Sequence, residues 1–199
     1  MMPTSGDKLI EIRIHGRGGQ GNVVAAYLLA AAAFEDGSFG QAFPSFGPER
    51  RGAPVTAFVR IADHPVRRRC QVTTPSFLLV QDEALLRTGD ITAGLGEKGA
   101  ILVNSSRPAE ELPAARNFKL VTIPATALAQ QMLGRPVPNT ALAAAFLALT
   151  KLVSLSALEA ALAQQFSGET LDRNTRLVRE AAQMVPAGAW KELCDGAAA

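Results

Sequence analysis

An apolar strand pattern, a glycine cluster and an apolar helix pattern follow one another directly near the start of the chain. Residues 9–14 read LIEIRI, the segment GRGGQG occupies residues 16–21, and residues 22–34 are almost wholly apolar without proline or glycine. We predict a buried strand that ends near His15, a tight turn and a buried helix. This succession is typical of the first unit of an α/β fold.

Further short apolar runs predict the remaining strands. They lie at residues 55–61, 77–80, 100–103 and 119–123. Helical stretches alternate with them, and parallel strands joined by such crossovers become buried on both faces. We therefore predict an α/β, Rossmann-like fold with a mostly parallel sheet flanked by helices. The segment 35–54, rich in glycine, proline and phenylalanine, is predicted to be a structured surface loop.

The C-terminal third predicts helices that pack on this α/β core. Residues 141–153 form an apolar helix that Asn139 or Thr140 can cap, and Ser154 or Ser156 can cap a second helix that reaches about Phe166. A third, amphipathic helix is predicted over residues 171–184. These helices span about 139–185, and the tail after Pro186 is predicted to be loose or bound to a partner. At 199 residues, we predict one domain over 1–199.

Charge and cysteine content exclude several function classes. The formal net charge is +2, so no global field attracts nucleic acid, and no run reaches the ~18 apolar residues of a membrane span. The start of the chain lacks the pattern of a cleaved leader, which predicts a cytoplasmic protein. Two cysteines cannot build a disulfide framework or a four-cysteine cluster. We predict no metal ligand and no catalytic residue in this chain.

The glycine segment is suited to an anion. Glycine permits positive φ and close backbone approach, and the amides at the start of the next helix lie at the positive end of its dipole. A ligand-free tight turn remains the alternative. A dinucleotide fingerprint needs an acidic residue ~20 positions on, at the end of a second strand. Glu35 and Asp36 directly follow the predicted helix instead, which disfavours nicotinamide or flavin.

A second constrained segment, FPSFGPERRGAPV at residues 43–55, carries two adjacent arginines. The planar forks of Arg50 and Arg51 suit phosphate or carboxylate, although Glu49 can pair with one of them in a loop that merely packs. His15 can orient a ligand or serve as a buried structural residue. The basic run 67–69 can meet an acidic partner or simply be solvated.

The chain resembles a known family along nearly its whole length. The stretches IRIHGRGGQGNVVAAYLLAAAAFEDG, QAFPSFGPERRGAPVTAFVRI, VQDEALL and RPVPNTALAAAFLAL are similar to the gamma subunit of pyruvate:ferredoxin oxidoreductase and its relatives. The piece ERRGAPV is the most specific. The pattern is closer to the pyruvate, branched-chain or aryl 2-oxoacid branches than to the 2-oxoglutarate branch.

The resemblance implies a subunit that is not catalytic alone. Alpha, beta and delta-type subunits would hold thiamine diphosphate, Mg²⁺ and [4Fe–4S] clusters, decarboxylate a 2-oxoacid, pass electrons to ferredoxin or another acceptor and form acyl-coenzyme A. The gamma-type domain would border the coenzyme A site. The implied cofactor-binding residues are Gly16, Arg17, Gly18, Gly19, Gln20, Gly21, Arg50 and Arg51. The alternatives are a freestanding nucleotide-binding or regulatory protein and, less favoured, a self-sufficient dehydrogenase.

Overall fold

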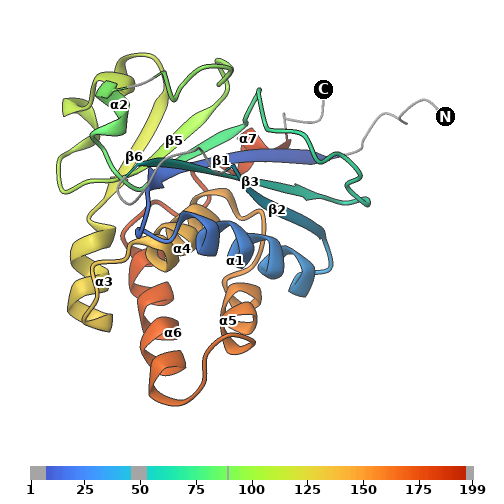
Figure 1. Cartoon of the computed structure of the whole chain (residues 1–199), viewed down its shortest axis with the longest axis vertical. Coiled ribbons are helices and arrows are strands. Elements are labelled where there is room, and N and C mark those ends of the chain that lie inside the picture. The colour runs from blue at the N-terminus through green and yellow to red at the C-terminus, as the bar shows by residue number, and fades with distance from the viewer. Residues whose placement is uncertain (1–7, 46–52, 89, 196–199) are drawn as a thin grey trace.

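A six-stranded sheet organises the computed structural model, which describes residues 8–45, 53–88 and 90–195 (Figure 1). Its strands are β1 (Leu9–Arg17), β2 (Phe39–Ser45), β3 (Pro54–Ala62), β4 (Phe77–Val80), β5 (Ala100–Asn104) and β6 (Lys119–Ile123), in the order β2-β3-β1-β4-β5-β6. Strands β1, β4, β5 and β6 are parallel, whereas β3 runs antiparallel to β1 and β2 antiparallel to β3. The predicted fold, an α/β protein with a mostly parallel sheet, is confirmed.

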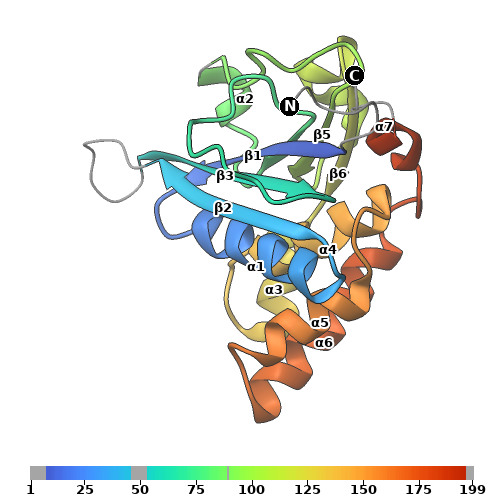
Figure 2. The ribbon, with the colours of Figure 1, turned by 90° about the vertical axis from the view of Figure 1, so that its right-hand side faces the viewer.

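Most of the helical mass lies on one face of this sheet. The helices are α1 (Asn22–Glu35), α2 (Leu85–Thr88), α3 (Ala125–Leu133), α4 (Asn139–Thr150), α5 (Leu155–Ala163), α6 (Gly168–Gln183) and α7 (Lys191–Asp195), with 3-10 turns η1 (Ala109–Glu111) and η2 (Pro113–Arg116). Figures 1 and 2 show α1 and α3 to α6 below the sheet and the short α2 above it. Within the described ranges, no helix is long and apolar enough to cross a membrane.

Side-chain alternation along β1 sorts residues between the two faces. Ile10, Ile12 and Ile14 are fully buried in the large core under the sheet, so Arg13 and His15 lie on the opposite face. All twelve residues of α4 are buried. The alanines of α4 let α1 and α6 pack closely around it, and Phe146 meets the Phe77 ring edge-on at 5.3 Å. The helical layer thus builds the main core.

The strand predictions are confirmed except in one segment. The strands 77–80 and 119–123 have the predicted bounds, and the first strand extends two residues further, to Arg17. The predicted loop 35–54 is wrong, because it contains the edge strand β2, paired to β3. Gly40 is needed there because a Cβ would come within 2.2 Å of the Ala30 carbonyl of α1, and Pro44 is tolerated on an edge strand.

Residues 187–195 of the C-terminal tail fold against the rest of the chain, so the prediction of a loose segment is wrong for them. Trp190 is 3% exposed, and its ring stacks on Phe77 at 5.8 Å. Cys194 of α7 is also buried. The three predicted helices of the C-terminal third are confirmed as α4, α5 and α6, and Ser154 caps α5 by accepting a hydrogen bond from Ala157 N. Helix α3 was not predicted.

Candidate functional site

The glycine segment joins β1 to α1 at the edge of the sheet where the parallel strands end. Arg17 N donates to Gln20 Oε1 at 2.7 Å and Gln20 N donates to Arg17 O at 3.1 Å, which closes a tight turn. Gly21 then precedes α1 with φ of 82°, and no side chain of the described residues caps this helix. Acidic residues are absent from the first turn of α1. The positive end of this 14-residue helix is therefore electrostatically open to an anion.

Three glycines of this segment have different surroundings. A Cβ on Gly16 would lie 2.3 Å from Asn22 Oδ1, and a Cβ on Gly21 would lie 2.8 Å from Asn139 Nδ2. In contrast, no described residue lies within 4 Å of a Cβ built on Gly19, whose φ is 98°. Gly16 and Gly21 therefore make room for the protein's own amide side chains. Gly19 alone of these three faces open space, where a ligand can approach the backbone.

Buried amide side chains support the segment from the helical side. Asn22 Nδ2 donates to Val55 O at 2.8 Å, and its Oδ1 is buried without a partner among the described residues. Gln81 follows β4 directly and donates its backbone N–H to His15 O at 2.7 Å. Its fully buried side-chain oxygen and nitrogen also have no partner in the described part of the chain. Sequence reasoning missed both residues, although a polar residue directly after a buried strand marks Gln81.

Arg17, a predicted ligand-binding residue, forms an ion pair with another residue of the same chain, Asp82. Its Nε donates to Asp82 Oδ2 at 2.6 Å, and Asp82 Oδ1 accepts from Ala84 N at 3.0 Å. The pair is partly exposed and connects the end of β1 to the segment after β4. The Asp82 carboxylate offsets the Arg17 charge, so the geometry favours a role for Arg17 in fixing the loop.

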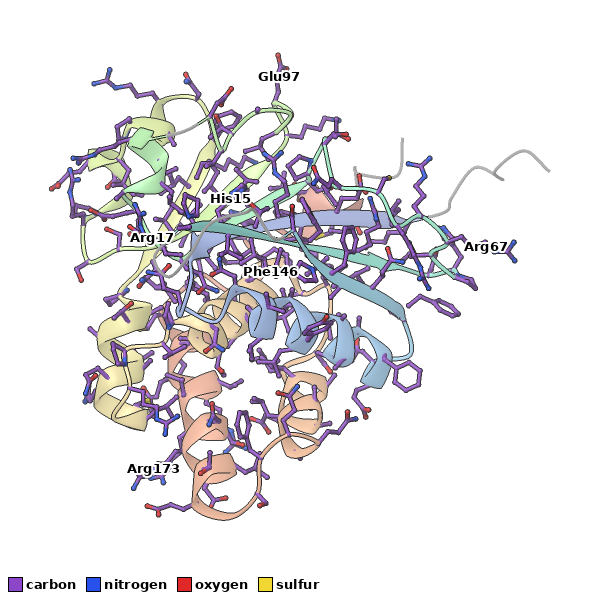
Figure 3. All side chains as sticks on the ribbon, viewed as in Figure 1. His15, Arg17, Arg67, Glu97, Phe146 and Arg173 are labelled. Atoms are coloured by element: carbon purple, nitrogen blue, oxygen red, sulfur yellow. The ribbon has the colours of Figure 1, made fainter. Side chains whose placement is uncertain are left out.

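His15 is buried on the upper side of the sheet, across from Phe146 below it (Figure 3). Its Nδ1 lies 3.5 Å from Thr56 Oγ1, and Nε2 is buried without a partner among the described residues. Burial, together with a smaller effect of the charge of Arg13, lowers the pKa of His15 to about 4. The ring is therefore neutral at neutral pH.

We expect acid to destabilise the fold through His15. In the unfolded chain His15 binds a proton below its ordinary pKa of 6.5, whereas in the folded chain it binds one only below about pH 4. The folded state therefore loses stability as pH falls from 6.5 to about 4. The loss in the free energy of unfolding is about 3 kcal/mol. Denaturant unfolding across this range should show a weaker pH dependence for His15→Gln than for wild type. His64→Gln is the control, and equal slopes for His15→Gln and wild type would refute the assignment.

The chain and its fold have counterparts among known proteins. Residues 11–184 match the family model described as pyruvate ferredoxin/flavodoxin oxidoreductase. The chain belongs to this family. The pyruvate synthase subunit PorC of Methanothermobacter marburgensis is 49% identical over 171 residues, covering 86% of this chain and 94% of that relative. The common subunit gamma of the pyruvate/ketoisovalerate oxidoreductases of Pyrococcus abyssi is 47% identical, covering 87% and 95%.

Solved structures agree with this membership. The crystal structure of the pyruvate oxidoreductase subunit PORC of Thermotoga maritima has a TM-score of 0.80 and 38% identity, covering 88% of this chain and 96% of that one. A 2-oxoglutarate:ferredoxin oxidoreductase of Magnetococcus marinus shares the fold at a TM-score of 0.72 and 21% identity, with 91% of this chain matching 32% of that longer chain. The protein is thus a gamma-type subunit of an oxoacid oxidoreductase of this family.

Two further predictions concern residues outside the glycine segment in the sequence. Arg50 and Arg51 lie outside the described residues. Glu35 and Asp36 end α1 at its far end, where Glu35 accepts a hydrogen bond from Gln164 Nε2 and Asp36 from Ser154 Oγ. Both acidic side chains thus tie α1 to the segment around α5. They lie about 20 Å from the glycine segment along a 14-residue helix, which agrees with the argument against a dinucleotide.

The two cysteines of this oxidoreductase subunit lie in different environments. Cys70 is exposed, whereas Cys194 is buried in α7, and burial raises the pKa of its thiol to about 11. A thiol with this pKa is a packing group and a poor nucleophile. Across residues 8–45, 53–88 and 90–195, no three His, Cys, Asp or Glu side chains gather where they could hold a metal ion.

Proposed function

We propose that this gamma-type subunit helps to bind coenzyme A in a complex that oxidatively decarboxylates a 2-oxoacid of the pyruvate, branched-chain or aryl type to acyl-coenzyme A. The observation that carries the proposal is the open space over Gly19 at the uncapped start of α1. Backbone amides and a helix dipole directed at one point suit the phosphates of coenzyme A. The same edge of the sheet is where α/β proteins bind their ligands.

Each residue of the segment has a distinct part in this proposal. Gly19 lets a phosphate approach the backbone, and Gly18 lies beside it with its own N–H held by Ala53 O at 3.1 Å. Gly16 and Gly21 let the segment pack against the buried side-chain amides of Asn22 and Asn139. Arg17 and Gln20 hold the turn closed.

Arg50 and Arg51 supply the positive charge in this proposal. The described glycine segment carries one arginine, already paired with Asp82. Phosphates therefore need a further cation, and guanidinium forks bind them in the bidentate manner that suits their oxygens. The proposal also includes contacts with other subunits, made through the segment that carries Arg50 and Arg51.

The remaining chemistry belongs to other chains of the complex. Thiamine diphosphate with Mg²⁺ would supply the decarboxylation and [4Fe–4S] clusters the route of electrons to ferredoxin or another acceptor. Two cysteines in this sequence cannot ligate a four-cysteine cluster. We propose alpha, beta and delta-type subunits as the partners, a cytoplasmic location without nucleic acid or membrane insertion, and one domain over residues 1–199 as this chain's own contribution.

Purification under native conditions tests the proposed function. We expect alpha, beta and delta-type chains to accompany this subunit, and the complex to require coenzyme A for turnover of a 2-oxoacid. The separated chain should contain neither stoichiometric iron nor thiamine, because its two cysteines cannot hold a cluster, and should lack oxidoreductase activity. Metal analysis, mass spectrometry of the associated chains and activity assays decide this. Stoichiometric cluster or turnover in the separated chain would overturn the proposal.

A further inference from the structure

A pocket lies on the opposite face of the sheet from α1 and the main core. It encloses about 440 Å³ between β1, β3 and the loops around residues 71–73 and 93–94. Its polar lining includes Arg13, His15 and Thr56, and its apolar lining includes Phe58, Val72 and Ala93. We call this space the β1–β3 pocket. Because Ile14 and Gly16 face the helices, the pocket is separate from the space over the glycine segment.

The walls of the β1–β3 pocket are held by specific contacts. The Arg13 guanidinium donates to Ile91 O at 2.8 Å and to Ala93 O at 2.7 Å, which fixes the loop that closes one side. Gly94, with φ of 77°, lies against Thr73 so closely that a Cβ would come within 1.9 Å of the Thr73 carbonyl. The loops on this side therefore have little room to collapse into the pocket.

Two nitrogen atoms of residues that line the pocket are buried without a hydrogen-bond partner among the described residues. They are Arg13 Nε and His15 Nε2, from alternate residues of one strand. If the Thr56 hydroxyl donates to His15 Nδ1, 3.5 Å away, the neutral ring carries its proton on Nε2. Both unpartnered atoms are then N–H donors. Leaving such donors buried and unsatisfied is unfavourable, and a ligand that accepts from both would remove the penalty.

We propose that the β1–β3 pocket binds a small organic carboxylate, with one oxygen accepting from Arg13 Nε and the other from His15 Nε2. The described lining contains no acidic side chain that would repel this group. Two donors match the two oxygens of a carboxylate, whereas phosphate has more oxygens to satisfy. The pocket is larger than an inorganic ion needs, and Phe58, Val72 and Ala93 give an aliphatic tail an apolar surface.

The sequence offers a direct assay, because His15 and His64 are its two histidines. The full chain, labelled with ¹⁵N in histidine, is titrated with sodium acetate and sodium butyrate while the imidazole resonances are followed. We expect a saturable downfield shift of the His15 Nε2–H signal and none for His64, which lies outside the pocket. Two more methylene groups against the apolar wall should make butyrate roughly tenfold tighter than acetate. Butyramide and butylammonium, which lack the anion, serve as controls.

Variants separate the pocket from general ionic effects. Arg13→Gln should weaken butyrate binding by about tenfold, since it removes a charged donor. Arg67→Gln, which removes an exposed arginine outside the pocket, should leave binding unchanged. The wild-type titration needs no variant, so a folding defect in Arg13→Gln leaves the test intact. A His15 signal that does not respond to either carboxylate, or that saturates with inorganic phosphate instead, would overturn the proposal.

Discussion

Replacing Arg60 with leucine should cost the fold about 3 to 5 kcal/mol, because it leaves the partly buried Glu11 carboxylate without its partner. Arg60 is 1% exposed, and its Nε donates to Glu11 Oε1 at 2.7 Å. The guanidinium also donates to Gln41 Oε1 at 3.2 Å and to Cys70 O at 2.8 Å, and lies over the Phe43 ring. One side chain therefore joins β1, β2, β3 and the loop that follows β3.

Thermal and denaturant unfolding of the purified chain measure this loss. For a chain of this size, the melting temperature should fall by roughly 10 °C. Arg179→Leu is the matched control, because Arg179 pairs with Glu159 on the surface and exposed pairs contribute at most about 1 kcal/mol. Adding Glu11→Leu to Arg60→Leu should recover part of the stability. Equal effects of Arg60→Leu and Arg179→Leu would contradict a structural role for the buried pair.

Gly21→Ala should destabilise the chain by about 2 to 4 kcal/mol, through positive φ together with a steric conflict. A Cβ at this position would lie 2.8 Å from Asn139 Nδ2 and 3.2 Å from Asn139 Cβ, and Asn139 is buried at the start of α4. Gly19→Ala shares the backbone strain but has nothing within 4 Å of its Cβ. It should therefore cost no more than about 1 to 2 kcal/mol.

The two glycine variants also separate folding from ligand binding. In the assembled complex, Gly19→Ala places a methyl group in the space assigned to a phosphate and should raise the coenzyme A concentration needed for half-maximal turnover. The first half of the reaction, in which the complex reacts with the 2-oxoacid in the absence of coenzyme A, should be unaffected. Gly21→Ala should instead lower the yield of assembled complex. If Gly19→Ala assembled normally with unchanged coenzyme A dependence, the space over Gly19 would not be a phosphate site.

Local pattern was sufficient to predict the fold class and the position of the glycine segment. A β-branched run, a glycine cluster and an apolar helix are each local signals, and they agree with one another over residues 9–34. The strand β2 was missed because Gly40 and Pro44 oppose a strand locally, while pairing with β3 and contact with α1 decide the outcome. The tail was misjudged because burial of Trp190 depends on Phe77, more than a hundred residues away.

The contacts that the supporting residues of the site make depend on strand register and could not be predicted. Gln81 meets the glycine segment because β1 and β4 align His15 with Val80. Asn22 reaches Val55 because β1 and β3 align Gly16 with Val55. No short motif encodes either alignment. Arg60 looks like the arginines of the run 67–69 in sequence, yet Arg60 is buried while the run is exposed. The pocket around His15 likewise needs β1, β3 and two distant loops to come together.

Hydrogen exchange of the assembled complex, with and without coenzyme A, tests most directly whether the glycine segment contacts this ligand. The segment 16–24 contains the positive-φ glycines and the first turn of α1, whose amides are assigned to the phosphates. Coenzyme A should slow exchange at residues 18–24 and leave residues 155–163 of α5, which packs at the far end of α1, unchanged. Unaltered exchange at residues 18–24, in a complex that turns over with coenzyme A, would contradict the assignment.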